Sequence, residues 1–146
     1  MFNILVVEDD DNLRKLMSAV LKKSRFNVIQ AADGKQALDA IDNNHIDLMV
    51  CDIMLPGMNG YEITETIRNT DKDMPILMVT ALESLNDKRM GFAAGTDDYM
   101  VKPIDMDEMI MRISALLRRA KATSERRITV GDAEVDMDSM TVTKGA

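Results

Sequence analysis

The sequence contains a single cysteine, Cys51, among its 146 residues. One cysteine excludes an internal disulfide framework and is consistent with a reducing cytoplasm. No apolar run is long enough to span a bilayer, and the N-terminus shows no secretory pattern, so neither a membrane span nor a signal peptide is expected. Lysine and arginine number 18 against 25 aspartates and glutamates, which gives a net charge of −7. Such a chain is not expected to bind nucleic acid well by itself.

The length of the chain suffices for one ordinary domain and little more. With 46% hydrophobic and 29% charged residues, its composition is that of a soluble globular protein. Apolar runs of strand length alternate five times with segments whose apolar residues recur at helical spacing. This alternation predicts an α/β fold, in which five helices surround a doubly wound, five-stranded parallel sheet. The expected strands are residues 4–7, 26–31, 48–51, 75–79 and 99–101, and the expected helices are residues 13–21, 37–41, 61–68, 85–94 and 105–119.

Two acidic clusters follow separate strands of the expected sheet. Asp52 ends the apolar run that begins at Leu48, and the first strand is followed by Glu8-Asp9-Asp10-Asp11. One acidic cluster alone would mean little, because acidic surface loops are common. In a doubly wound sheet, however, the functional crevice lies beyond the C-terminal ends of the strands, which is where both clusters fall. The pattern therefore predicts one acidic pocket.

Such a pocket suits a divalent cation and a phosphoryl group. Mg²⁺ prefers one or two carboxylates together with water and a phosphate. A cation shared by Asp9 and Asp52 neutralises the repulsion between them. Asp52 is then able to attack phosphorus as a nucleophile while its charge is balanced. The acidic clusters thus predict the chemistry of a phosphoryl acceptor.

Two further polar residues lie at strand ends. Lys102 follows the last expected strand, where it is either a solvated lysine in a turn or a partner for Asp52 and later for phosphoryl oxygens. Thr80 follows the fourth strand, where its hydroxyl is either structural or a hydrogen-bond donor to a phosphoryl oxygen. Each residue alone is weak evidence. Together with the acidic clusters, they form a set at successive strand ends that favours the functional interpretation.

With these residues in place, the sequence resembles the receiver domain of bacterial two-component response regulators. The resemblance covers residues 2–120 and rests on four motifs, which occur in the family's order and spacing: Val7-Glu8-Asp9-Asp10, the run from Asp52 to Gly60, Val79-Thr80-Ala81, and the run from Gly95 to Pro103. It implies a flavodoxin-like sheet with strand order 2-1-3-4-5. It also implies a cytoplasmic signalling protein rather than an enzyme, one that catalyses only its own phosphotransfer and slow dephosphorylation.

The resemblance implies how the phosphoryl group is accepted. Asp52 would take it from a phosphohistidine on a sensor histidine kinase. Mg²⁺ would be held by Glu8, Asp9 and Asp52 together with the backbone carbonyl of Met54. No other cofactor is implied.

The resemblance also implies how the phosphoryl group is sensed. Thr80 and Lys102 would bind its oxygens, and Tyr99 would be the switch aromatic that turns inward as Thr80 moves. The Lys102–Pro103 bond is expected to be cis, as is feasible only before proline.

The helix expected over 85–94 has a thin apolar stripe and contains Gly91, which costs about 1 kcal/mol relative to alanine. We expect this marginal helix to shift on phosphorylation.

The pattern changes after Arg119. Residues 121–127 are polar and indicate a linker, and residues 128–146 alternate apolar with polar residues, which indicates short antiparallel strands. This tail resembles the start of the second domain of OmpR/PhoB-type regulators, a winged helix that binds DNA. The recognition helix that enters the major groove is absent. The expected organisation is therefore a receiver domain over 1–120, a linker over 121–127 and the start of a truncated DNA-binding domain over 128–146.

In that subfamily, phosphorylated receivers form homodimers through the fourth helix, fifth strand and fifth helix. By position, charged pairs and one apolar contact would cross the two-fold axis. Exposed ion pairs are individually worth little, and Arg89 stands where the family usually has an apolar residue. The pairs expected by position are Lys88 with Glu108, Asp98 with Arg112, Asp97 with Arg118 or Arg119, and Phe92 with Met111.

Two other functions deserve comparison with this interpretation. A phosphohydrolase of the aspartyl-phosphate type would need a second acid two residues after Asp52, where the sequence has Met54. A flavin-binding protein of the same fold would need a hydroxyl-rich loop after the first strand, where the acidic run over 8–11 would repel a phosphate. Both functions are therefore disfavoured.

Overall fold

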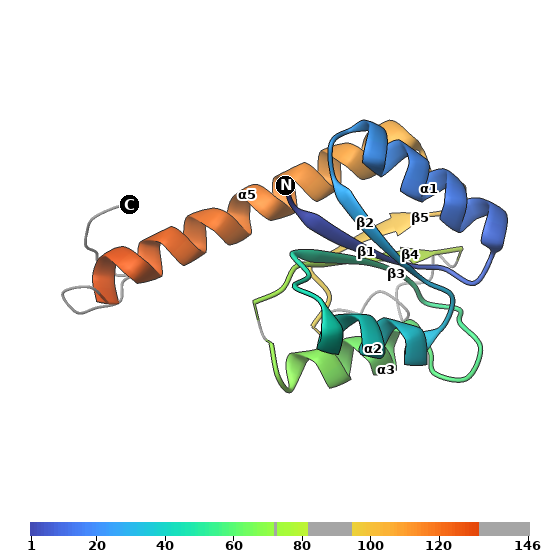
Figure 1. The fold of residues 1–146 in the computed structure, drawn as a ribbon, viewed down its shortest axis with the longest axis horizontal. Coiled ribbons are helices and arrows are strands. Elements are labelled where there is room, and N and C mark those ends of the chain that lie inside the picture. The colour runs from blue at the N-terminus through green and yellow to red at the C-terminus, as the bar shows by residue number, and fades with distance from the viewer. Residues whose placement is uncertain (72, 82–94, 132–146) are drawn as a thin grey trace. The chain divides into compact units, whose positions relative to one another are not determined.

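The computed structural model describes residues 1–71, 73–81 and 95–131, with side chains up to residue 122 (Figure 1). The chain divides into two compact units, Met1–Ile113 and Ser114–Ala146. The helix expected over 85–94 lies outside the described residues. The described elements are β1 (Asn3–Val7), α1 (Asp11–Lys23), β2 (Asn27–Ala31), α2 (Gly34–Asn43), β3 (Leu48–Asp52), α3 (Gly60–Arg68), β4 (Ile76–Thr80), β5 (Asp98–Val101) and α5 (Met106–Gly131).

The five strands form one parallel sheet in the order β2-β1-β3-β4-β5. Both the doubly wound sheet and its strand order are therefore confirmed. In Figure 1, α1 and the start of α5 cover one face of the sheet, and α2 and α3 cover the other. Because helices cover both faces, β3 and β4 are apolar along almost their whole length and are buried throughout.

Helix α1 illustrates how the sequence determines an element. Asp10 is its N-cap, and the Asp10 carboxylate accepts a hydrogen bond from the backbone N–H of Leu13 at 3.1 Å. This bond satisfies one of the amides that the first turn leaves unpaired. Met17 and Leu21 lie one turn apart on the side of the helix that faces the sheet, and both are buried. The helix predicted over 13–21 is thus confirmed and begins directly after the acidic loop.

The C-terminal helix differs from the prediction. The sequence was expected to leave the helix at Arg119, enter a linker over 121–127 and begin a strand at Ile128. In the structure α5 continues to Gly131. Residues 120–127 include Ala, Lys, Glu and Arg, which favour helices, and no glycine or proline interrupts the chain before Gly131. The rest of the expected antiparallel segment, residues 132–146, lies outside the described residues.

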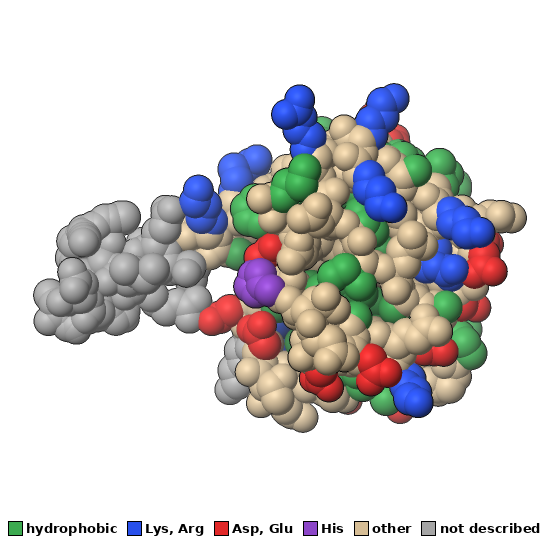
Figure 2. Space-filling view, in the orientation of Figure 1, with side chains coloured by type: hydrophobic (Ala, Val, Ile, Leu, Met, Phe, Trp, Pro, Cys, Tyr) green, Lys and Arg blue, Asp and Glu red, His purple; other side chains and the backbone are tan. Residues whose placement is uncertain are grey.

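The surface carries charges of both signs. On the face shown in Figure 2, basic side chains gather along the upper part and acidic side chains along the lower edge. This face has no uniformly basic patch of the kind that coats a phosphate backbone. Among the described helices, none combines the length and the apolar character that crossing a membrane requires.

One close approach fixes the loop after β3. The backbone N–H of Gly60 donates to the carbonyl of Ile53 at 2.9 Å. A Cβ atom on Gly60 would lie 2.7 Å from the carbonyl oxygen of Asp52 and 3.0 Å from Cα of Ile53. Both neighbours are backbone atoms, which cannot move aside as a flexible side chain can. A glycine at this position therefore lets α3 begin directly against the end of β3.

We expect Gly60→Ala to lower the free energy of unfolding by about 1–3 kcal/mol, the usual cost of overpacking. Helix propensity alone would favour alanine by up to about 1 kcal/mol, so the sign of the change separates the two effects. Urea unfolding followed by circular dichroism measures it. Thr66→Ala, on the exposed face of the same helix, is the matched control. An unchanged or increased stability of Gly60→Ala would show that the close approach imposes no constraint.

Candidate functional site

Backbone hydrogen bonds tie the ends of neighbouring strands together at the C-terminal edge of the sheet. The N–H of Ile53 donates to the carbonyl of Val79 at 3.0 Å, which continues the β3–β4 pairing beyond Asp52. In the same way, the N–H of Lys102 donates to the carbonyl of Thr80 at 2.7 Å. The residues that follow β3 and β5 are therefore held in fixed positions at one edge.

Three carboxylates meet at this edge. Oxygens of Glu8, Asp9 and Asp52 all lie within 4.8 Å of one another. Glu8 and Asp52 are buried, whereas Asp9 is exposed. Burial raises the pKa of Glu8 to about 7, and the charge of Asp52 adds to this, although a hydrogen bond from the backbone N–H of Asp10 opposes the shift. Full ionisation of the three carboxylates is therefore unfavourable in these surroundings.

Lys102 supplies a positive charge in contact with two of these carboxylates. Its Nζ lies 2.7 Å from Oδ2 of Asp52 and 3.2 Å from Oε1 of Glu8. Burial alone would lower the pKa of Lys102, but the hydrogen bond to Asp52 and the charges of both carboxylates outweigh it and raise the pKa above its usual value. Lys102 is therefore protonated and bridges the two buried carboxylates. The Lys102–Pro103 bond is cis, as expected.

The carboxylate of Asp52 is held through both of its oxygens. Oδ1 accepts a hydrogen bond from the backbone N–H of Met54 at 3.1 Å, and Oδ2 accepts one from Lys102. Cys51 lies beside it, fully buried, and burial together with the charges of Asp52 and Glu8 raises the pKa of this thiol. A neutral, buried thiol is a poor nucleophile. Of the two groups at this strand end, Asp52 rather than Cys51 is therefore the candidate nucleophile.

The two expected switch residues lie on the adjoining strands. Thr80 ends β4 and is completely buried, and Tyr99 of β5 is 8% exposed. The sheet pairs Thr80 with Val101 and Tyr99 with Met78. The structure thus brings oxygens of Glu8, Asp9 and Asp52 within 4.8 Å of one another and places Lys102 in contact with Glu8 and Asp52. Thr80 lies at the next strand end.

Arg14 is a site residue that the sequence did not single out. Its guanidinium donates to the carbonyl oxygen of Glu8 at 2.8 Å. Periodicity does not distinguish this arginine from a solvated one on an amphipathic helix. The feature of the sequence that could have identified Arg14 is its position, four residues after the N-cap Asp10, which itself follows Glu8 and Asp9.

Four of the residues expected at a dimer interface, Asp97, Asp98, Glu108 and Arg112, have partners within the chain. Asp98 forms an ion pair with Arg112 at 2.8 Å, and Arg112 also binds Glu108 at 2.8 Å. Asp97 binds Arg68 at 2.8 Å. Pairing of these groups across a two-fold axis remains a prediction. Of the other expected interface residues, Met111, Arg118 and Arg119 are exposed, whereas Lys88 and Phe92 lie outside the described residues.

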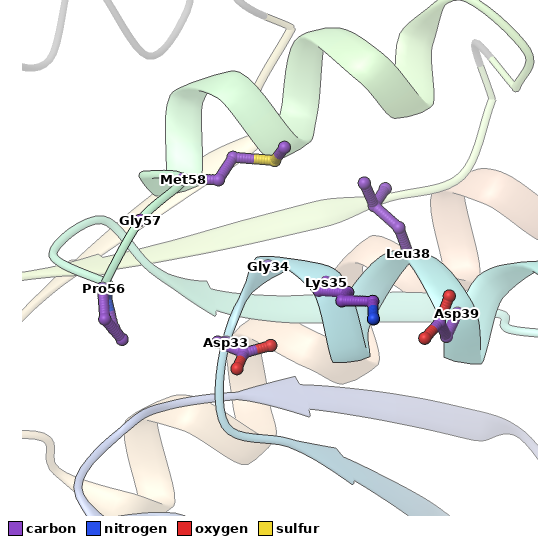
Figure 3. Close-up of a pocket in the computed structure, with 8 residues that line it drawn as sticks. All are labelled: Asp33, Gly34, Lys35, Leu38, Asp39, Pro56, Gly57 and Met58. Atoms are coloured by element: carbon purple, nitrogen blue, oxygen red, sulfur yellow. The ribbon is translucent and has the colours of Figure 1, made fainter.

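A cleft of about 370 Å³ opens between the start of α2 and the loop after β3 (Figure 3). Asp33, Lys35 and Asp39 come from the α2 side, and Pro56 and Met58 from the loop. The residues that line it do not include the carboxylate cluster or its lysine. The cleft is therefore separate from the acidic edge of the sheet.

We expect Lys102→Met to destabilise the fold in metal-free buffer, because two buried carboxylates lose their counter-ion. Breaking a fully buried pair from one side costs about 3–5 kcal/mol. Because Lys102 is 26% exposed, we expect a smaller loss, of about 1–3 kcal/mol. Urea unfolding of Lys102→Met in wild-type and Asp52→Asn backgrounds measures it, with the exposed Lys15→Met as control. An equal cost in both backgrounds would contradict a charge-pair role.

Comparison with known proteins agrees with this geometry. Residues 4–114 match the family model of the response regulator receiver domain. The whole chain is 34% identical to the heme response regulator HssR of Staphylococcus epidermidis and covers 65% of it. Over 97% of its length it is 38% identical to the DNA-binding response regulator MtrA of Mycolicibacterium smegmatis, of which it covers 61%. The chain thus spans less than two thirds of the length of these relatives.

Solved structures are similar over most of the chain. A response regulator receiver domain protein from Methanospirillum hungatei superposes with a TM-score of 0.80 at 29% identity, over 83% of this chain and 97% of that one. The BeF3-activated receiver domain of DrrB superposes with a TM-score of 0.76 at 33% identity, over 82% of this chain and 99% of that one. The matched residues include Glu8, Asp9, Asp52 and Lys102. The chain therefore belongs to the response regulator receiver domain family, whose members are phosphorylation-switched signalling regulators.

Proposed function

We propose that Asp52 is the phosphoryl acceptor of this receiver and that a sensor histidine kinase is the donor. The observation that carries this proposal is the carboxylate of Asp52 itself. It is buried beside the carboxylates of Glu8 and Asp9. Its Oδ1 accepts a hydrogen bond from the backbone N–H of Met54, and its Oδ2 accepts one from Nζ of Lys102. A carboxylate fixed in this way is oriented before the donor arrives, which lowers the cost of reaching the reactive geometry.

The donor atoms at this edge fit Mg²⁺. Hard carboxylate oxygens are the ligands this ion prefers, and a cation would relieve the repulsion that contributes to the raised pKa of Glu8. Glu8, Asp9 and Asp52 would hold it together with the backbone carbonyl of Met54. When bound, the ion neutralises charge on the phosphoryl oxygens.

In the transfer step, an oxygen of Asp52 forms a bond to phosphorus as the phosphorus–nitrogen bond of the phosphohistidine breaks, and the histidine leaves. Lys102 starts in contact with Asp52 and then pairs with the new phosphoryl oxygens. The hydroxyl of Thr80 donates to another of these oxygens. At the position where a hydrolase would carry its second acid, the exposed Met54 offers none. The chain therefore catalyses only its own phosphorylation and a slow loss of the phosphoryl group.

We propose that the output follows from Thr80 and Tyr99. Movement of Thr80 toward the phosphoryl group changes the packing around Tyr99 on β5 and favours homodimers through the fourth helix, β5 and α5. The relative MtrA is by name a DNA-binding regulator. By this analogy, the full protein is a cytoplasmic transcription regulator of the OmpR/PhoB type. DNA contacts would belong to a winged-helix domain that follows α5 in the full protein.

Incubation with acetyl phosphate and Mg²⁺ tests the acceptor. We expect wild type to gain one phosphoryl group by intact mass and Asp52→Ala to gain none, because the variant lacks the proposed nucleophile. Asp39→Ala, an exposed aspartate on α2, is the control and should be labelled like wild type. Equal labelling of wild type and Asp52→Ala would remove Asp52 from the role.

The dimer is tested by a charge placed on its expected apolar centre. Met111 is 67% exposed, so Met111→Asp should leave the fold and the labelling intact while preventing the phosphorylated chain from dimerising. Light scattering after gel filtration gives the mass. Leu16→Asp replaces another exposed apolar residue, 52% exposed on α1, and should still dimerise. Phosphorylated Met111→Asp eluting as a dimer would place the interface elsewhere.

A further inference from the structure

Arg14 joins three elements around the acidic loop. Its Nη1 donates to the carbonyl oxygen of Glu8 at 2.8 Å, at the end of β1. Its Nη2 donates to the carboxylate of Asp11 at 2.6 Å, in the first turn of α1. Its Nε donates to the side-chain oxygen of Gln30 on β2 at 3.2 Å. Each nitrogen of the guanidinium thus binds a different element, and the side chain is only 12% exposed.

These contacts act on the backbone that carries two of the carboxylates. The carbonyl group that Arg14 binds belongs to the peptide unit between Glu8 and Asp9. Fixing this peptide unit restricts the rotation that would carry the two side chains away from Asp52. The N–H of Glu8 is held from the other side by the carbonyl of Ala31 at 3.0 Å. The loop is therefore clamped on both sides of Glu8, and Arg14 supplies one of the two clamps.

We propose that Arg14 is a positioning residue for cation binding, which holds Glu8 and Asp9 in the arrangement that Mg²⁺ requires. This inference rests on the proposed function. Groups that orient metal ligands without touching the metal commonly affect its affinity by about 10- to 100-fold. Arginine is suited to the role because its planar fork binds several acceptors in fixed directions, which a lysine ammonium does not reproduce.

The direction of the change in Mg²⁺ affinity distinguishes a positioning role of Arg14 from an effect of its charge alone. Arg14 is a cation beside a cation site, so its charge alone repels Mg²⁺. If charge were its only influence, Arg14→Gln would bind Mg²⁺ more tightly and Arg14→Lys would bind like wild type. Positioning predicts the opposite result: both variants bind Mg²⁺ more weakly, although Arg14→Lys keeps the charge. Lys15→Gln removes an equal charge from the next, exposed position of α1 and is the matched control.

The experiment titrates Mg²⁺ alone into each folded variant. The chain contains no tryptophan, so binding is followed by amide shifts of the β1–α1 loop in NMR spectra or by calorimetry. We expect the Mg²⁺ dissociation constant to rise about 10- to 100-fold in Arg14→Gln, to rise in Arg14→Lys, and to stay unchanged or fall in Lys15→Gln. With acetyl phosphate, the Mg²⁺ concentration for half-maximal labelling should rise, and the rate at saturating Mg²⁺ should return near that of wild type.

A purely structural role for Arg14 would lower the unfolding midpoint and leave Mg²⁺ affinity unchanged. Equal or tighter Mg²⁺ binding in both Arg14 variants would therefore overturn the proposal, whatever their stability. If Arg14→Gln does not fold, the result for Arg14→Lys decides. Failure of wild type to bind Mg²⁺ would instead refute the proposed function, so the two failures are distinguishable.

Discussion

The structure depends on like charges held together at the ends of buried strands. Glu8, Asp9 and Asp52 follow β1 and end β3, which are adjacent in the sheet, so the fold itself forces their carboxylates within 4.8 Å. Repulsion at this distance in a buried site is strong, and Lys102 at the end of β5 offsets part of it through its contacts with Asp52 and Glu8. The remaining imbalance makes this edge receptive to a cation and to a phosphoryl group bound with it.

The surrounding structure keeps this arrangement from relaxing. Backbone hydrogen bonds from Ile53 and Lys102 tie the strand ends to β4. Gly60 lets α3 begin against the carbonyl of Asp52, and Arg14 clamps the loop that carries the other two carboxylates. Without such constraints, the side chains would separate toward solvent and the cluster would lose its chemistry. Rigid support around a polar site is what preorganisation requires.

The sequence was informative where local pattern and topology agree. Apolar runs located all five strands, and the rule that parallel strands end at one edge brought Asp52 and Asp9 together. Prediction failed where an element had no terminator: α5 continues past Arg119 to Gly131 because the intervening residues favour a helix. Arg14 was missed because its contacts with the main-chain carbonyl of Glu8 and with the side chain of Gln30 leave no periodicity in the sequence. Similarly, nothing local indicated that Asp98 pairs with Arg112 of its own chain.

The central claim is that Asp52 becomes phosphorylated at this edge, and chemical trapping tests it most directly. The protein is treated with acetyl phosphate and Mg²⁺ and then with borohydride, which reduces an aspartyl phosphate to homoserine, and peptides are sequenced by mass spectrometry. The account predicts homoserine at position 52 and at no other position. Reduction at Asp9, at another carboxylate, or at none would contradict it.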